Sequence, residues 1–171
     1  MSEPTFRPDR LVAAGEANDA SGQRNGSTQQ HRWHTQTLLG GDDVPEEERG
    51  DCVRAAMTSI LGLPIDAAPN FQGSNWWGSW QEFVAGYGFE LLVIWPKQMP
   101  YPPAGLWLCV VPSLVMNGNH CVVARGKELV HDPAMKRRYT ADEWNELWAD
   151  EYRVLEGWLL APLDPAKAVA A

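Results

Sequence analysis

The chain has 171 residues, a formal net charge of −8 and a sequence pI of about 4.9. Hydrophobic residues make up 44% of it, which is a globular composition and sufficient for one domain with its own core. The acidic balance argues against nucleic-acid binding, because contact with phosphates needs a basic surface.

The N-terminal region, residues 1–32, is rich in Gly, Ser, Asn, Gln and charged residues and predicts a flexible arm. We expect the domain to cover residues 33–163, with a frayed tail over 164–171. The segment 40–50 carries five acidic residues and a proline, and it predicts a solvated surface loop. Recognition of a basic substrate is the less favoured role for these acids, which are Asp42, Asp43, Glu46, Glu47 and Glu48.

Two helices are predicted next. The first covers residues 51–61, and Asp51 can cap its start. Gly62, with Pro64 beyond it, is a stop signal. The second covers residues 76–87, where apolar side chains recur at i, i+4, i+7, i+8 and i+11 and form one stripe. That stripe consists of Trp76, Trp80, Phe83, Val84 and Tyr87.

After the second helix the pattern changes to short runs of β-branched and aromatic residues. These runs predict strands over 89–95, 105–111, 120–125, 128–131 and 153–161. Before the last of them, the sequence Thr140-Ala141-Asp142-Glu143 is typical of a capping box and predicts a helix over 141–150. Helices followed by mainly sequential strands indicate an α+β fold with an antiparallel sheet of about four to five strands.

The cysteines and the N-terminal residues indicate a cytoplasmic protein. The chain has three cysteines, an odd number without a closely spaced pair, which fits a reducing compartment better than a disulfide framework. The first residues lack the apolar region of a secretory signal peptide. No apolar run approaches the roughly 18 residues of a membrane span, so we expect no membrane association.

Cys52 follows the turn-forming pair Gly50-Asp51, which places its thiol in the first turn of the first predicted helix. The unpaired N–H groups and the dipole of a helix start favour the thiolate, which is the nucleophilic form of cysteine. His120 opens a predicted strand 68 residues later, and Asp132 follows after another 12. These three residue types can supply, in this order, a nucleophile, a general base and a group that orients the base.

The role of Asp132 depends on the turn of the predicted hairpin. A two-residue turn at Gly126-Lys127 would place His120 opposite the residue after Asp132. A three-residue loop that also includes Arg125 would place His120 opposite Asp132 itself. We favour the three-residue loop, in which Gly126 is free to adopt a positive φ. His131 then points to the opposite face and is rejected as the base, whereas the shorter turn would reverse this.

Acyl transfer also needs hydrogen-bond donors for the oxyanion. The backbone N–H of Cys52 is one candidate, and the side chain of Gln36 is another. The tryptophans are expected mainly in core packing, with a peptide-binding groove as the alternative. The groove candidates are Trp76, Trp77 and Trp80.

A metal site is a weaker interpretation of the same residues. Cys52, Cys109, Cys121 and His120 could surround zinc, but no CxxC or HxxxH spacing supports this. No phosphate-binding glycine-rich loop precedes a helix either. We therefore expect neither a metal nor another cofactor.

Two segments carry a family resemblance: GDCVRAAMTSILGLPIDAAPNF at 50–71 and NHCVVARGKELVHDP at 119–133. They resemble papain-like cysteine peptidases, in particular small bacterial and phage-encoded domains related to the leader peptidases of bacteriocin-exporting transporters. The resemblance covers about residues 33–162. It implies a cysteine at the start of the central helix, a histidine and an aspartate on adjacent strands, and a glutamine in the oxyanion hole. By motif these are Cys52, His120, Asp132 and Gln36.

The sequence therefore predicts a thiol hydrolase that cleaves a peptide, isopeptide or amide bond in a peptide or protein substrate. Two alternatives stay open. One is a papain-like module without turnover that holds a peptide in a groove lined by tryptophans. The other is a transamidase or acyltransferase that uses the same three residues, because this superfamily includes several kinds of acyl-transfer enzyme.

Overall fold

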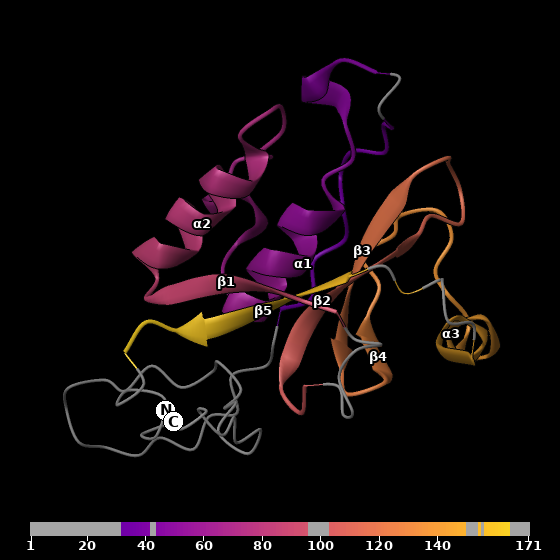
Figure 1. Ribbon diagram of the computed structural model, residues 1–171. Coiled ribbons are helices and arrows are strands. Elements are labelled where there is room, and N and C mark those ends of the chain that lie inside the picture. Colours follow the sequence, from indigo (N-terminus) through magenta and orange to yellow (C-terminus); the bar gives the residue numbers. More distant parts are fainter. Residues whose placement is uncertain (1–31, 42–43, 96–102, 150–153, 155, 165–171) are drawn as a thin grey trace.

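The computed structural model describes residues 32–41, 44–95, 103–149, 154 and 156–164 (Figure 1). These residues form an α+β fold with a five-stranded antiparallel sheet and three α-helices, in agreement with the predicted class. The helices are α1 (Cys52–Leu61), α2 (Trp76–Gly86) and α3 (Ala141–Ala149). The strands are β1 (Phe89–Ile94), β2 (Leu106–Pro112), β3 (Asn119–Arg125), β4 (Glu128–His131) and β5 (Glu156–Pro162). The expected arm and tail lie almost wholly outside the described residues.

The strands lie in the order β1-β5-β2-β3-β4. The last strand, β5, is therefore inserted between β1 and β2 and pairs antiparallel with both. One face of the sheet packs against α1 and α2, and the other packs against α3 (Figure 1). This three-layer arrangement explains the continuous apolar runs of β2 and β3, since both of their faces are buried.

Alternation along β3 assigns its residues to the two cores. Cys121 and Val123 belong to the core shared with α1 and α2, whereas Val122 and Ala124 belong to the core shared with α3. Small residues on α1, Ala55 and Ala56, are fully buried and allow the helix to approach the sheet closely. The α1 helix, which begins with the candidate nucleophile, is thus fixed directly over β3.

The helix termini largely follow the sequence signals. Gly62 ends α1 in the left-handed conformation, with a φ of 67°. At the start of α3, the Glu143 N–H donates to the Thr140 hydroxyl, and the Thr140 N–H donates to the Glu143 carboxylate. This reciprocal pair is the predicted capping box. The predicted cap of α1 is wrong, because the Asp51 side chain makes no hydrogen bond to the helix start.

The β3–β4 hairpin differs from the favoured prediction. Arg125 pairs with Glu128, so the turn is the two-residue Gly126-Lys127 and not a three-residue loop. Ala124 pairs with Leu129, but Val123 pairs with His131, which leaves Val130 as an extra residue. This β-bulge shifts the register by one and so returns the following residue, Asp132, to the face it would have had with a longer loop.

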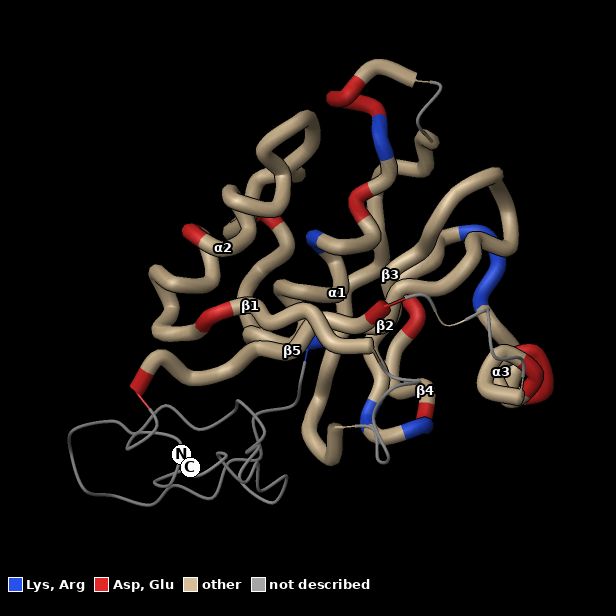
Figure 2. The backbone as a smooth tube through the Cα atoms, viewed as in Figure 1, with Lys and Arg blue, Asp and Glu red and all other residues tan. Residues whose placement is uncertain are grey.

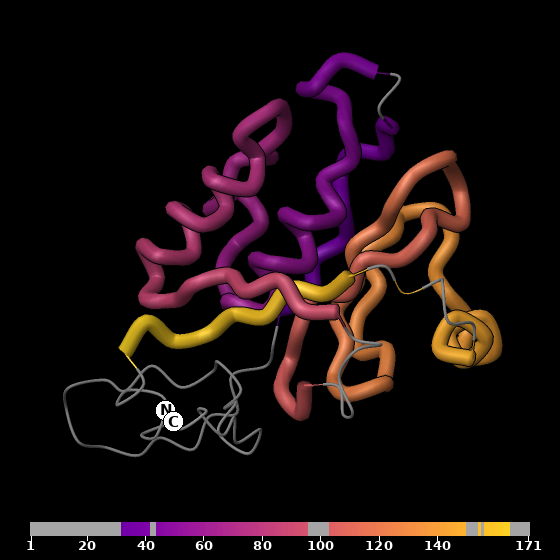
Figure 3. Tube along the Cα trace, viewed as in Figure 1, coloured from indigo at the N-terminus to yellow at the C-terminus, as the bar shows by residue number. Residues whose placement is uncertain are grey.

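The N-terminal described segment crosses the sheet edge beside β4. The Gln36 N–H donates to the Pro133 carbonyl at 2.8 Å, and His131 Nε2 lies 2.6 Å from the His34 carbonyl oxygen. The His131 ring also stacks on Trp33. Figure 3 shows this indigo segment running close to α1 and the orange strands. Residues near 36 are thereby brought beside residues near 132.

Among the acidic residues that Figure 2 marks along the backbone, two groups are close together in sequence. Glu46–Glu48 form a single 3-10 turn, and all three are exposed. Asp142 and Glu143 lie in the first turn of α3. Within the described ranges, no helix combines the length and the apolar character needed to cross a bilayer.

Gly157 offers a test of the packing between β5 and β2. A Cβ at this position would lie 2.5 Å from the ring of the fully buried Trp107. We expect Gly157→Ala to lower the free energy of unfolding by about 1–3 kcal/mol, measured by urea denaturation. Gly86→Ala is the matched control, because a Cβ there meets nothing within 4 Å. Equal stabilities of the two variants would contradict the prediction.

Candidate active site

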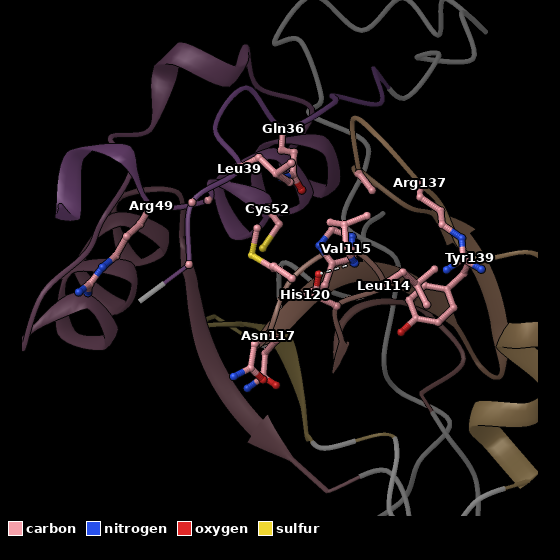
Figure 4. Close-up of a pocket in the computed structure, with 18 of the residues that line it drawn as sticks. Gln36, Leu39, Arg49, Cys52, Leu114, Val115, Asn117, His120, Arg137 and Tyr139 are labelled. Carbon is pink, nitrogen blue, oxygen red and sulfur yellow. Dashed lines mark hydrogen bonds between the residues drawn. The ribbon is translucent and has the colours of Figure 1, made fainter. Parts of the chain in front are cut away.

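Cys52, His120 and Asp132 come together at one end of the sheet. Cys52 is the first residue of α1, His120 is the second residue of β3, and Asp132 directly follows β4. His120 Nε2 lies 2.8 Å from Asp132 Oδ1. The histidine and the aspartate are 8% and 5% exposed, so their interaction is shielded from water. Figure 4 shows Cys52 and His120 side by side in the pocket.

Asp132 is held by the chain that follows it. Its Oδ1 also accepts the Ala134 N–H at 2.9 Å, and its Oδ2 accepts the Tyr139 N–H at 2.8 Å. Burial raises the pKa of the carboxyl, but the hydrogen bond and charge of His120 and the two backbone donors outweigh burial and lower it. Asp132 is therefore an ionised, fixed acceptor for the imidazole.

The pKa of His120 is raised to about 9. Burial of the ring lowers it, but hydrogen bonds to Asp132 and Cys52 and the charges of both groups raise it by more. Because Nε2 is taken by Asp132, Nδ1 is the ring nitrogen left for the thiol. The site thus favours a protonated His120 imidazole at neutral pH, with the Asp132 carboxylate on one side and Cys52 on the other.

Gln36 lies beside this group, and it is 4% exposed. Its Nε2 donates to the Leu38 carbonyl at 2.9 Å, which fixes the amide plane. Its Oε1 is buried and accepts no hydrogen bond within the described part of the chain. Figure 4 shows the Gln36 side chain pointing toward the pocket that holds Cys52.

The acidic loop does not separate Gln36 from Cys52, because its two ends meet. The Gly50 N–H donates to the Gly40 carbonyl at 2.8 Å and closes the neck of the loop. A Cβ at position 40 would lie 2.2 Å from the Glu48 carbonyl oxygen, so this approach requires glycine. The described residues between the two glycines therefore form an excursion whose ends, Gly41 and Arg49, line the pocket.

Asp51 is fully buried and connects the two segments. Its Oδ1 accepts the Thr37 N–H at 2.7 Å and the Leu38 N–H at 2.9 Å. Its Oδ2 accepts the Thr37 hydroxyl and the guanidinium of Arg54. This network explains why the carboxylate does not cap α1: its oxygens face the segment that contains Gln36.

Cys52, His120 and Gln36 share a pocket with a volume of about 270 Å³. One wall is the loop between β2 and β3, which contributes Leu114, Val115 and Met116. Another wall is formed by the neck of the acidic loop, where Arg49 lies beside the glycines. Further lining residues are Leu39, Gly40, Gly41, Gly50, Gln72, Asn117, Asn119, Ala134, Arg137 and Tyr139.

The structure does not bring the three candidate groove tryptophans into this pocket. Trp80 is 1% exposed and packs edge-on against Phe71. Trp76 and Trp77 pack against each other and against Trp158. Trp80 therefore lies in the core between α2 and the sheet, and the partly buried Trp76 and Trp77 pack against that core.

Two other parts of the pocket were not identified from the sequence. The β2–β3 loop had no signal beyond its Asn-Gly-Asn turn, and its apolar residues resembled ordinary loop residues. Tyr139 orients Asp132 through its backbone N–H, a contact that any residue type could make. Its hydroxyl donates to the Pro112 carbonyl, which ties this segment to the end of β2.

The other two cysteines are buried in the sheet. Burial raises the pKa of Cys109 and of Cys121, so both are unreactive thiols. No cluster of three or more His, Cys, Asp or Glu residues suited to a metal ion occurs among the described residues.

Comparison of the chain with protein-family models, with curated proteins and with solved structures gave no match. The functional assignment therefore rests on the geometry of the pocket.

The raised pKa of His120 predicts a pH-dependent stability. A pKa of about 9 in the folded protein exceeds the ordinary value of 6.5, so protonation stabilises the fold. This contribution is complete below pH 6.5 and is lost as the pH rises through about 9. We expect the difference in unfolding free energy between wild type and His120→Gln to shrink by about 3 kcal/mol over this range, measured by denaturant titration.

The Cys52→Ser variant is the control for this measurement. It removes the thiol that interacts with His120 but keeps the hydrogen bond between His120 and Asp132, so part of the pH dependence should remain. A difference between wild type and His120→Gln that is the same at both ends of the range would contradict the prediction.

Proposed function

We propose that this protein is a papain-like thiol hydrolase that cleaves a peptide, isopeptide or amide bond. The observation that carries the proposal is that Cys52 and His120 line one pocket, with the buried Asp132 carboxylate 2.8 Å from Nε2 of the imidazole. A thiol at a helix start, a buried histidine and a buried carboxylate are the parts of a nucleophilic acyl-transfer site.

In the first half of the reaction, the Cys52 thiolate attacks the carbonyl carbon of the scissile bond, and the carbonyl oxygen becomes an oxyanion. The His120 imidazolium then gives its proton to the leaving nitrogen as the carbon–nitrogen bond breaks. The amine departs and the acyl group stays on the sulfur as a thioester. Asp132 keeps the ring oriented and stabilises its positive charge.

In the second half, neutral His120 takes a proton from a water molecule that attacks the thioester. The carbon–sulfur bond breaks, the acid is released, and the thiolate–imidazolium pair is restored. An amine in place of water would give transamidation by the same steps. Hydrolysis is the simpler reaction because the pocket opens to water.

Two donors are assigned to the oxyanion. The N–H of Cys52 lies at the start of α1, where no side chain caps the helix. The Gln36 amide nitrogen has two hydrogens, and the Leu38 carbonyl takes one of them. The second hydrogen is left for the oxyanion. These donors are set by the fold before substrate binds, which is the condition for efficient electrostatic stabilisation.

The apolar part of the pocket wall favours an apolar residue beside the scissile bond of the substrate. Leu114, Val115 and Met116 offer this apolar surface in the same pocket as Cys52 and His120. The alternative of a binding module without turnover is less favoured, because the tryptophans on which it depended pack in or against the core and do not line the pocket.

The absence of a disulfide among the three cysteines is relevant to the cellular compartment of the protein. Cys52, Cys109 and Cys121 form no disulfide. A nucleophilic thiol must stay reduced to act, so we place the protein in the cytoplasm.

Alkylation of Cys52 by iodoacetamide tests the thiolate–imidazolium pair without a substrate. We expect wild type to react at about pH 6, where an ordinary thiol with a pKa of about 8.5 is protonated. His120→Ala should react only as the pH approaches that of an ordinary thiol. Cys52→Ala should not be labelled, because the two remaining thiols are buried. Wild-type labelling that follows an ordinary thiol would contradict the proposal.

Turnover of a peptide and isopeptide library, followed by mass spectrometry, is the accompanying measurement. Cys52→Ala should abolish cleavage of any substrate found, and Asp132→Asn should reduce kcat by several orders of magnitude. Full activity in Cys52→Ala would exclude the mechanism.

The apolar wall gives a prediction about specificity. Val115 is 40% exposed in the pocket, and an acidic side chain there would oppose an apolar substrate residue. We expect Val115→Asp to lower kcat/KM about tenfold for peptides with an apolar residue beside the scissile bond, mainly through KM. Val93→Asp is the control, because Val93 is 44% exposed on β1. Equal effects of the two substitutions would contradict this role.

A further inference from the structure

We infer that Asp51 is a positioning residue that holds the segment containing Gln36 against the start of α1. As a statement about turnover it rests on the proposed function. As a statement about the placement of Gln36 it stands on the contacts alone. Asp51 is adjacent in sequence to the nucleophile, and its carboxylate is directed away from the helix that it precedes.

The position of Asp51 normally belongs to a helix cap. An aspartate there usually accepts the N–H of the second or third helical residue. Here Oδ1 accepts the N–H groups of Thr37 and Leu38, at 2.7 and 2.9 Å. The carboxylate is fully buried, and the guanidinium of Arg54 balances its charge.

These contacts act directly on the Gln36 amide. Asp51 Oδ1 accepts the Leu38 N–H, and the Leu38 carbonyl in turn accepts a hydrogen of Gln36 Nε2 at 2.9 Å. The Gln36 backbone N–H is held from the other side by the Pro133 carbonyl, next to Asp132. Gln36 is thereby fixed between Asp51, the residue before the nucleophile, and Pro133, the residue after Asp132.

Because the Asp51 carboxylate is oriented toward Thr37 and Leu38, the start of α1 has no side-chain cap. If the carboxylate capped the helix, it would place a negative charge beside the N–H groups that the oxyanion needs. By turning to Thr37 and Leu38, Asp51 keeps its charge away from them and secures the second donor. The Asp51 side chain thus contributes to both proposed oxyanion donors, the Cys52 N–H and the Gln36 amide.

Two substitutions separate this role from helix capping. Asp51→Asn keeps an oxygen that can accept the Thr37 and Leu38 N–H groups. Asp51→Ser is a strong capping residue, but its side chain is one bond shorter and does not reach those groups. A residue that only stabilised α1 would tolerate serine. A residue that positions Gln36 would tolerate asparagine better.

The first readout does not depend on activity. We expect the Thr37 and Leu38 amides to be protected from hydrogen exchange in wild type and in Asp51→Asn, and to lose at least about tenfold protection in Asp51→Ser. The side-chain amide signal of Gln36 should shift in Asp51→Ser alone. Thr37→Val is the matched control, since it removes the hydroxyl contact to Asp51 but leaves both backbone donors.

The second readout separates kcat from nucleophile reactivity. Asp51→Ser should lower kcat by roughly 10- to 100-fold at unchanged KM, since loss of one oxyanion donor costs about 100- to 1,000-fold. The rate of Cys52 alkylation should stay within about twofold of wild type, because alkylation develops no oxyanion. Gln36→Ala should lower kcat similarly, and the double variant should show no further loss.

The outcomes distinguish this inference from the proposed function. Unchanged protection and an unchanged Gln36 signal in Asp51→Ser would overturn the inference, whether or not the protein is an enzyme. Lost protection with full kcat would also overturn it. If wild type cleaves no substrate, the proposed function fails, and the exchange and Gln36 measurements alone decide the placement.

Discussion

The candidate site depends on one irregularity, the β-bulge at Val130. A sheet alternates its side chains strictly, so a single residue added to or removed from a strand moves everything beyond it to the other face. With the two-residue turn and no bulge, His131 would share the face of His120. The bulge instead places Asp132 there, 2.8 Å from the imidazole. His131 is left on the other face, where burial lowers its pKa and it stacks on Trp33.

The site lies where the two layers meet at the end of the sheet. Cys52 packs against the core under α1 and α2, whereas Tyr139 and Leu114 belong to the core on the side of α3. Only at the end of β3 can a histidine reach partners from both layers. Elements far from the pocket support both layers: the tryptophan cluster packs in and against the core that also buries α1, and the capping box fixes the start of α3.

The helices and strands were predictable from the sequence because local signals specify where they begin and end. Gly62 and the capping box at Thr140 mark helix ends by conformational rules that need no tertiary information. The hairpin register was predicted wrongly, since a bulge has no reliable signal in a run such as Glu128–His131. The location of the tryptophans was equally inaccessible, because an aromatic stripe on a helix suits a groove and a core alike.

Gln36 shows why spacing in sequence is a poor guide to spacing at a site. Fifteen residues separate it from Cys52, and a loop closed at its neck by Gly40 and Gly50 removes most of that distance. The entropic cost of closing a loop grows only slowly with its length, so an acidic excursion of this size is tolerated if its ends are fixed. The ends are fixed by a backbone hydrogen bond and by the buried carboxylate of Asp51, and neither depends on the residues at the tip. The distance between the candidate oxyanion donor and the nucleophile is therefore set by the neck of the loop and by Asp51.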